Sequence, residues 1–111
     1  MTARERVVRD TYTAWQTADR RLIERCLGEE LTFSSPPDPG LDRNGYFERC
    51  WPYAGHPERF DIQRLIENGE EVVVTYVATR ADNSRFRNTE VFGFDADNRI
   101  KTIEVYFGWD L

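Results

Sequence analysis

Apolar residues in the first half of the chain recur at the spacing of α-helices. Val8, Tyr12 and Trp15 stand at positions i, i+4 and i+7, with arginine and aspartate residues on the opposite face. This spacing predicts a helix over residues 3–17, because it gathers the apolar side chains on one side of a structure with about 3.6 residues per turn. The segment 2–5 reads T-x-x-E, a capping box that marks the start of such a helix.

Two shorter helical patterns follow. Asp19 can cap a second helix, whose apolar stripe ends at Leu27, and Gly28 is expected to end it in a left-handed conformation. Asp42 can cap a third helix, which must end before Pro52, because a proline disfavours helical conformation in the preceding residue. We therefore expect a pair of adjacent helices and a third one farther along the chain.

From residue 59 the apolar spacing changes to two, which is typical of strands. Asn68 and Gly69 form the strongest hairpin signal in the chain. The pattern predicts one short strand before the third helix and four antiparallel strands after it, at residues 31–35, 59–67, 71–80, 85–94 and 101–109. This order of elements predicts an α+β fold with the helices on one face of a curved sheet.

Residues 72–79 are apolar or nearly so on both faces of their predicted strand. An antiparallel sheet normally exposes one face to water and then shows a clean alternation of apolar and polar positions. Three helices can cover only one face, so the other face needs a second cover. A homodimer formed face to face through the sheet would supply it. The alternative is an exposed convex face rich in valine and threonine.

Composition narrows the class of protein. The 111 residues fit a single domain, residues 1–111, and the net charge of −5 speaks against nucleic acid and membrane surfaces as partners. Cys26 and Cys50 form no C-x-x-C motif, and with one histidine they do not make a common zinc site, so no metal is expected. Both cysteines fall on predicted apolar helix faces, which is typical of buried thiols in a reducing cytoplasm; a disulfide between them is the alternative.

Three segments carry a resemblance to a known family. They read GYFERCWP in the third predicted helix, and RFRNTEVFGF and IKTIEVYFG in the last two predicted strands. With the order of elements, they make the chain resemble the SnoaL-like (polyketide-cyclase-like) branch of the nuclear transport factor 2-like superfamily over nearly its whole length. The resemblance implies a cystatin-like cone, in which a curved antiparallel sheet wraps around the N-terminal helices, leaves a pocket at its open end and often dimerises.

The superfamily includes polyketide cyclases, ketosteroid isomerases, epoxide hydrolases, dehydratases and binding modules without catalysis, so the fold alone names no reaction. The Asp-Arg-Asp arrangement of the epoxide hydrolases does not map onto this chain. The isomerases place a carboxylate near the loop after the first strand, where Asp38 stands among prolines and could equally stabilise a turn. The cyclases have a strand-borne acid with a histidine nearby, which Glu90 and His56 resemble.

Glu90 is the first candidate for proton transfer. The two-residue period places it on one strand face with Phe86, Asn88 and Phe92. Among aromatic side chains a carboxyl group loses contact with water, which raises its pKa towards neutrality, as a general acid or base requires. The alternative is a Glu90 that pairs with an arginine or is solvated at the rim of the cone.

His56 is the second catalytic candidate, because an imidazole titrates near neutral pH, although a loop histidine can equally be solvated. Six aromatic residues with a hydroxyl or indole group are candidates for binding a substrate: Tyr12, Trp15, Tyr46, Trp51, Tyr76 and Tyr106. Tyr106 shares a strand face with Glu104. The alternation leaves open whether that face points into the pocket or towards a dimer partner.

These residues predict a pocket for a small apolar or partly polar molecule. If the protein is an enzyme, we expect acid/base chemistry without a cofactor: isomerisation, cyclisation, dehydration or hydrolysis. Glu90 would move the proton, and His56 or a tyrosine hydroxyl would stabilise the developing oxyanion. The chain has no nucleophile elbow and no glycine-rich phosphate loop. The alternatives are a ligand-binding module without turnover and a protein-interaction module.

Overall fold

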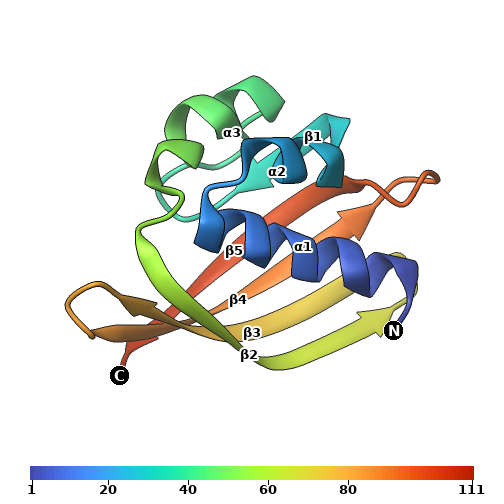
Figure 1. The fold of residues 1–111 in the computed structure, drawn as a ribbon. Helices are drawn as coiled ribbons and strands as arrows, with labels where there is room; N and C mark the ends of the chain where they lie inside the picture. The colour runs from blue at the N-terminus through green and yellow to red at the C-terminus, as the bar shows by residue number, and fades with distance from the viewer.

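A curved five-stranded sheet carries the helices on its concave side (Figure 1). The computed structural model describes residues 1–111, apart from the side chain of Glu58. The helices are α1 (Ala3–Thr17), α2 (Arg20–Cys26), α3 (Arg43–Arg49) and a short 3-10 helix, η1 (Trp51–Tyr53). The strands are β1 (Leu27–Ser34), β2 (Pro57–Asn68), β3 (Glu71–Arg80), β4 (Arg85–Phe94) and β5 (Ile100–Asp110). They lie in the order β1-β5-β4-β3-β2.

The helix starts follow the capping signals in the sequence. Thr2 accepts a hydrogen bond from the backbone N–H of Glu5 at 3.1 Å, and Ala18 ends α1 in a left-handed conformation with φ of 54°. Asp19 caps α2 and Asp42 caps α3, each by accepting a bond from a backbone N–H three residues later. These bonds satisfy donors that the first turn of a helix leaves unpaired. The predicted helix over residues 3–17 is confirmed.

The prediction that Gly28 ends the second helix is wrong. The chain passes directly from α2 into β1 at Leu27, whose φ of −94° and ψ of 135° are extended. The lack of a side chain at Gly28 serves packing instead. A Cβ there would lie 3.0 Å from a carboxylate oxygen of Asp95 and 3.2 Å from the carbonyl oxygen of Ile100. Sequence pattern alone cannot distinguish this close approach from a helix stop, because both favour glycine.

The sheet has one parallel edge. β1 runs parallel to β5, pairing Thr32 with Thr102 and Ser34 with Glu104. The pairs of β2 with β3, β3 with β4, and β4 with β5 are antiparallel. The α+β class and the curved sheet are confirmed. The edge differs from the expected antiparallel sheet because no tight turn joins β1 to β5, and only such a turn would force opposite directions.

The core lies between the helices and the concave face of the sheet. Alternate residues of β3 point into it, and Val72, Val74 and Ala78 are fully buried. Val8 of α1 and Ile23 of α2 complete this layer from the helical side. Removal of such side chains from water is the main stabilising contribution to the fold.

None of the described helices has the length and hydrophobicity that a membrane-spanning segment needs.

No helix covers the convex face of the sheet (Figure 1). Thr75 and Val77 alternate with the core residues of β3, and they are still only 8% and 5% exposed. Thr75 shares a hydrogen bond of 2.9 Å with Thr89 of β4. Ile66 and Tyr106 on the flanking strands are more than half exposed. A homodimer through this face stays a prediction.

Gly108→Ala is expected to destabilise the sheet, because a Cβ there would overlap the backbone carbonyl oxygen of Arg87 on the neighbouring strand. Backbone cannot rotate out of the way, so the free energy of unfolding should fall by about 1–3 kcal/mol in urea denaturation. Gly93→Ala is the matched control, since its Cβ would meet the hydroxyl of Thr102, which can rotate away. A loss no larger in Gly108→Ala than in Gly93→Ala would contradict this account.

Candidate functional site

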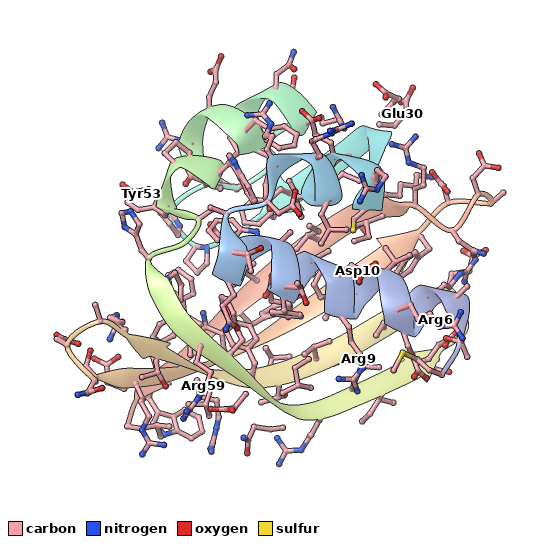
Figure 2. All side chains as sticks on the ribbon, viewed as in Figure 1. Arg6, Arg9, Asp10, Glu30, Tyr53 and Arg59 are labelled. Carbon is pink, nitrogen blue, oxygen red and sulfur yellow. The ribbon has the colours of Figure 1, made fainter. Side chains whose placement is uncertain are left out.

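A cavity of about 550 Å³ lies between the helices and the concave face of the sheet. Its walls are mostly aromatic and aliphatic, and all five strands contribute to them together with α1, α2 and α3. Tyr53, Phe107 and Trp109 line the cavity and are more than half exposed, so it opens where η1 faces the far end of β5. Figure 2 shows Tyr53 at the outer surface beside the start of β2.

Glu90 of β4 lines this cavity. It pairs across the sheet with the buried Val74, and its side chain points to the same side as the core. The hydroxyl of Tyr12, from α1, donates a hydrogen bond to Oε1 of Glu90 at 2.9 Å. Tyr76, from β3, stands beside the same carboxyl group, and its hydroxyl lowers the pKa of that group. A helix and two strands thus converge on one acid.

The environment of Glu90 changes its proton affinity. Burial raises the pKa of its carboxyl group from 4.5 to about 7, against the lowering effect of the hydrogen bonds from Tyr12 and Tyr76. Burial and the nearby Glu90 raise the pKa of both tyrosines above the ordinary 10.0. At neutral pH the carboxyl group is therefore divided between acid and base forms, while both hydroxyls keep their protons. This combination suits proton transfer beside hydrogen-bond donors.

Asn88 orients the hydroxyl of Tyr76. Its side-chain amide donates to that hydroxyl oxygen at 3.3 Å, and its carbonyl oxygen accepts from the backbone N–H of Gly108 at 3.1 Å. Because the Tyr76 oxygen accepts from Asn88, its own proton is free to point at Glu90. Asn88 was not among the predicted site residues. Its position two residues before Glu90 on the same strand face was the signal that could have identified it.

The aromatic candidates divide into two groups. Tyr12, Trp15, Tyr46 and Tyr76 line the cavity. The indole N–H of Trp15 donates to the hydroxyl of Tyr46 at 2.8 Å, which satisfies both groups in an otherwise apolar wall. Trp51 lies behind this wall, with its ring centroid 5.4 Å from that of Trp15, and it does not line the cavity.

Besides Trp51, two more predicted site residues lie outside the cavity. His56 is exposed in the loop before β2, with its ring centroid 6.2 Å from that of Tyr53, so it is not brought to Glu90. Tyr106 is 54% exposed on the convex side, where its hydroxyl bonds to the exposed Glu104 at 3.3 Å. Ile103, Val105 and Phe107, on the other face of β5, line the cavity. The open question of which face of the last strand enters the cavity is thereby answered.

Charged residues stand at the open end. Asp38, on the loop after β1, accepts a hydrogen bond from Nε of Arg49 at 2.6 Å. Arg80 lies 3.9 Å from Asp110 of β5. All four line the cavity. The sequence places Asp38 in a proline-rich loop and Arg80 near a strand end, where a surface charge is the ordinary expectation. No group of three or more described His, Cys, Asp or Glu side chains is placed to hold a metal ion.

Solved structures of low sequence identity share the fold. An NTF2-like protein of unknown function from Burkholderia pseudomallei K96243 is 20% identical, with a TM-score of 0.78 over 97% of this chain and 92% of that one. A ketosteroid isomerase-like protein from Kribbella flavida DSM 17836 is 13% identical, with a TM-score of 0.76 over 95% and 77%. A de novo designed protein with a curved β-sheet is 11% identical, with a TM-score of 0.82 over 97% and 88%.

No curated protein matches the chain. The family model of the SnoaL-like domain matches residues 8–103, from within α1 to the first residues of β5. This segment contains the helices, the strand-borne Glu90 and most of the cavity wall. The fold and the family match agree, and the chain belongs to the SnoaL-like domain family.

Proposed function

We propose that the cavity binds a small, largely apolar molecule and that Glu90 transfers a proton to or from it without a cofactor. The observation that carries the proposal is a carboxyl group among apolar walls that accepts a hydrogen bond from Tyr12 and whose pKa burial raises to about 7. Apolar pockets with a few convergent polar groups and a perturbed acid are typical of ligand and active sites.

Removal of a proton next to a carbonyl group is the reaction that this geometry suits best. The ionised carboxylate of Glu90 would take the proton from carbon, and negative charge would move to the carbonyl oxygen of the substrate. As Glu90 becomes protonated it accepts hydrogen bonds less strongly, so the hydroxyls of Tyr12 and Tyr76 can turn to the new oxyanion. Glu90 would then return the proton to another carbon. The ketosteroid isomerase-like neighbour makes an isomerisation of this kind the first reaction to test.

Binding without turnover is the second candidate. The observation in its favour is that the cavity offers no histidine beside Glu90, since His56 lies outside the lining residues that are described. Asp38, the other candidate acid, is bonded to Arg49 at the rim. Glu90 would then be the one proton-transfer group in the site. It could bind a hydroxyl or carbonyl group of the ligand by a hydrogen bond without any reaction following.

We also propose a homodimer formed through the convex face. Val73 of β3 pairs with Val91 of β4 near the centre of that face, and Ile66 and Tyr106 extend it on either side. Charged residues lie on the same face, among them Arg87 opposite Val77 and Glu104 opposite Val91, so the proposed contact centres on the valine pair. A self-complementary face is the common arrangement in two-fold dimers. The arrangement would leave the cavity on the far side of the sheet, open to its ligand.

Glu90→Gln is expected to lower turnover of a β,γ-unsaturated steroid ketone by at least about 10²-fold, because the amide cannot accept the proton. The rate is followed by the ultraviolet absorbance of the conjugated product. Glu104→Gln, on the exposed side of β5, is the control and should keep the full rate. Full activity in Glu90→Gln would remove Glu90 from the mechanism. Binding of the ketone without turnover by the unmodified protein would favour the second candidate.

The raised pKa of Glu90 also predicts how stability depends on pH. Between pH 4.5 and about 7 the folded state keeps a proton on Glu90 that the unfolded state releases. The free energy of unfolding should therefore fall as pH rises through this window, by up to about 3 kcal/mol, and level off above it. Glu90→Gln should lack this decrease and be the more stable protein at pH 8, as measured by thermal or urea unfolding. Identical pH profiles for the two proteins would contradict the assignment, and Glu104→Gln, at an exposed position of β5, serves as the control.

Val73→Lys is expected to separate the proposed dimer, because it places a charge at the centre of the apolar face. Light scattering should give the unmodified protein about twice the chain mass of 13.1 kDa, and the variant the mass of one chain. Thr13→Lys, at an exposed position of α1, adds the same charge elsewhere and should leave the dimer intact. A single-chain mass for the unmodified protein would refute the dimer.

A further inference from the structure

We propose that the ligand of this cavity carries an anionic group at its outer end and that Arg80 binds that group. The inference rests on the proposed function, since it needs the cavity to hold a small molecule. It adds the chemical class of the ligand: an elongated apolar body with a carbonyl or hydroxyl group at one end and a carboxylate, sulfonate or phosphate at the other.

The position of Arg80 in its strand aims it at the cavity. Val74, Tyr76 and Ala78 of β3 all face the core, and Arg80 is the next residue in the same alternation. Its guanidinium group lies over the ring of Phe86, 4.4 Å from the centroid, and donates to the hydroxyl of Ser84 at 3.1 Å. These contacts hold the guanidinium group at the rim of the cavity, where the side chain is 46% exposed. A ligand could therefore bind it without first having to order a flexible side chain.

The two rim arginines differ in how far their charge is already balanced. Asp38, whose side chain is 17% exposed, binds Arg49 at 2.6 Å, which is a short charge-assisted bond. Asp110, whose side chain is 83% exposed, lies 3.9 Å from Arg80, at the outer limit of an ion pair, and the exposed Asp82 reaches Arg80 only through the hydroxyl of Ser84. A solvated partner at that distance contributes little. Arg80 is therefore the cation whose charge a ligand can use.

The interior offers no place for the anionic group. Arg49 and Arg80 are the only basic residues among the described lining residues, and both stand at the rim. Deeper in the cavity an anion would meet aromatic walls and the carboxyl group of Glu90, and an unpaired buried charge is strongly disfavoured. Glu90 pairs with Val74, six residues before Arg80, and six residues of strand span about 20 Å. The charged and reactive ends of the ligand must be well separated.

A pair of fluorescent dyes tests the charge requirement. Anilinonaphthalene sulfonate and its uncharged parent, N-phenylnaphthylamine, share an apolar body and differ by one anionic group. We expect the unmodified protein to bind the sulfonate about fivefold to tenfold more tightly, since the bond is charge-assisted but partly exposed to water. Arg80→Gln should remove this preference by weakening the sulfonate alone. Arg80→Lys should restore part of it, and Asp110→Asn should increase it.

Arg59→Gln is the matched control. Arg59 lies one strand away, paired with Thr79 and bonded to Asp61, and it does not line the cavity. Figure 2 shows it projecting from β2 on the side away from α1. The variant removes the same charge and should keep the preference. An equal loss in Arg59→Gln and Arg80→Gln, or no loss in Arg80→Gln, would overturn the inference. Equal binding of both dyes would overturn it and leave the proposed cavity function standing, whereas binding of neither dye would overturn both.

Discussion

The enclosure of one carboxyl group by aromatic walls is the constraint on which the rest of the site depends. Glu90 lies between α1 and β3, where the hydroxyl of Tyr12 donates a hydrogen bond to it and the hydroxyl of Tyr76 stands beside it. Without those donors, burial would leave the acid without a hydrogen-bond partner, which costs a protein more than the bond itself contributes. With them, the group keeps two accessible protonation states near neutral pH. The arrangement of α1 across the curved sheet, which brings Tyr12 within reach of β4, is therefore part of the chemistry.

Much of this arrangement could be predicted from the sequence, because it follows from two periodicities. The caps at Thr2, Asp19 and Asp42 fixed the helix starts, and the Asn68-Gly69 pair fixed the first hairpin. The alternation along β4 predicts that Glu90 shares one strand face with Phe86, Asn88 and Phe92. Local patterns of this kind survive folding, because burial of one face enforces the register of the whole strand.

What could not be predicted concerns contacts between distant segments. The parallel pairing of β1 with β5 joins residues that are about 70 positions apart, and no local signal specifies it. The packing role of Gly28 against Asp95 depends on the same pairing. The placement of His56 outside the cavity depends on where a loop of glycine and proline residues leads the chain, and Arg80 at the rim depends on where β3 ends. Patterns within one element carry no information about these distances.

Both faces of β3 bury side chains, and the two faces make different contributions to stability. On the concave side Tyr76 packs against Tyr12, Phe60 and Phe86, yet the buried acid beside it works against stability at neutral pH. On the convex side Thr75 and Val77 are almost fully buried by their neighbours alone, so this side contributes stability without a helix. Burial on the convex side can therefore offset part of the cost of holding Glu90 on the concave side.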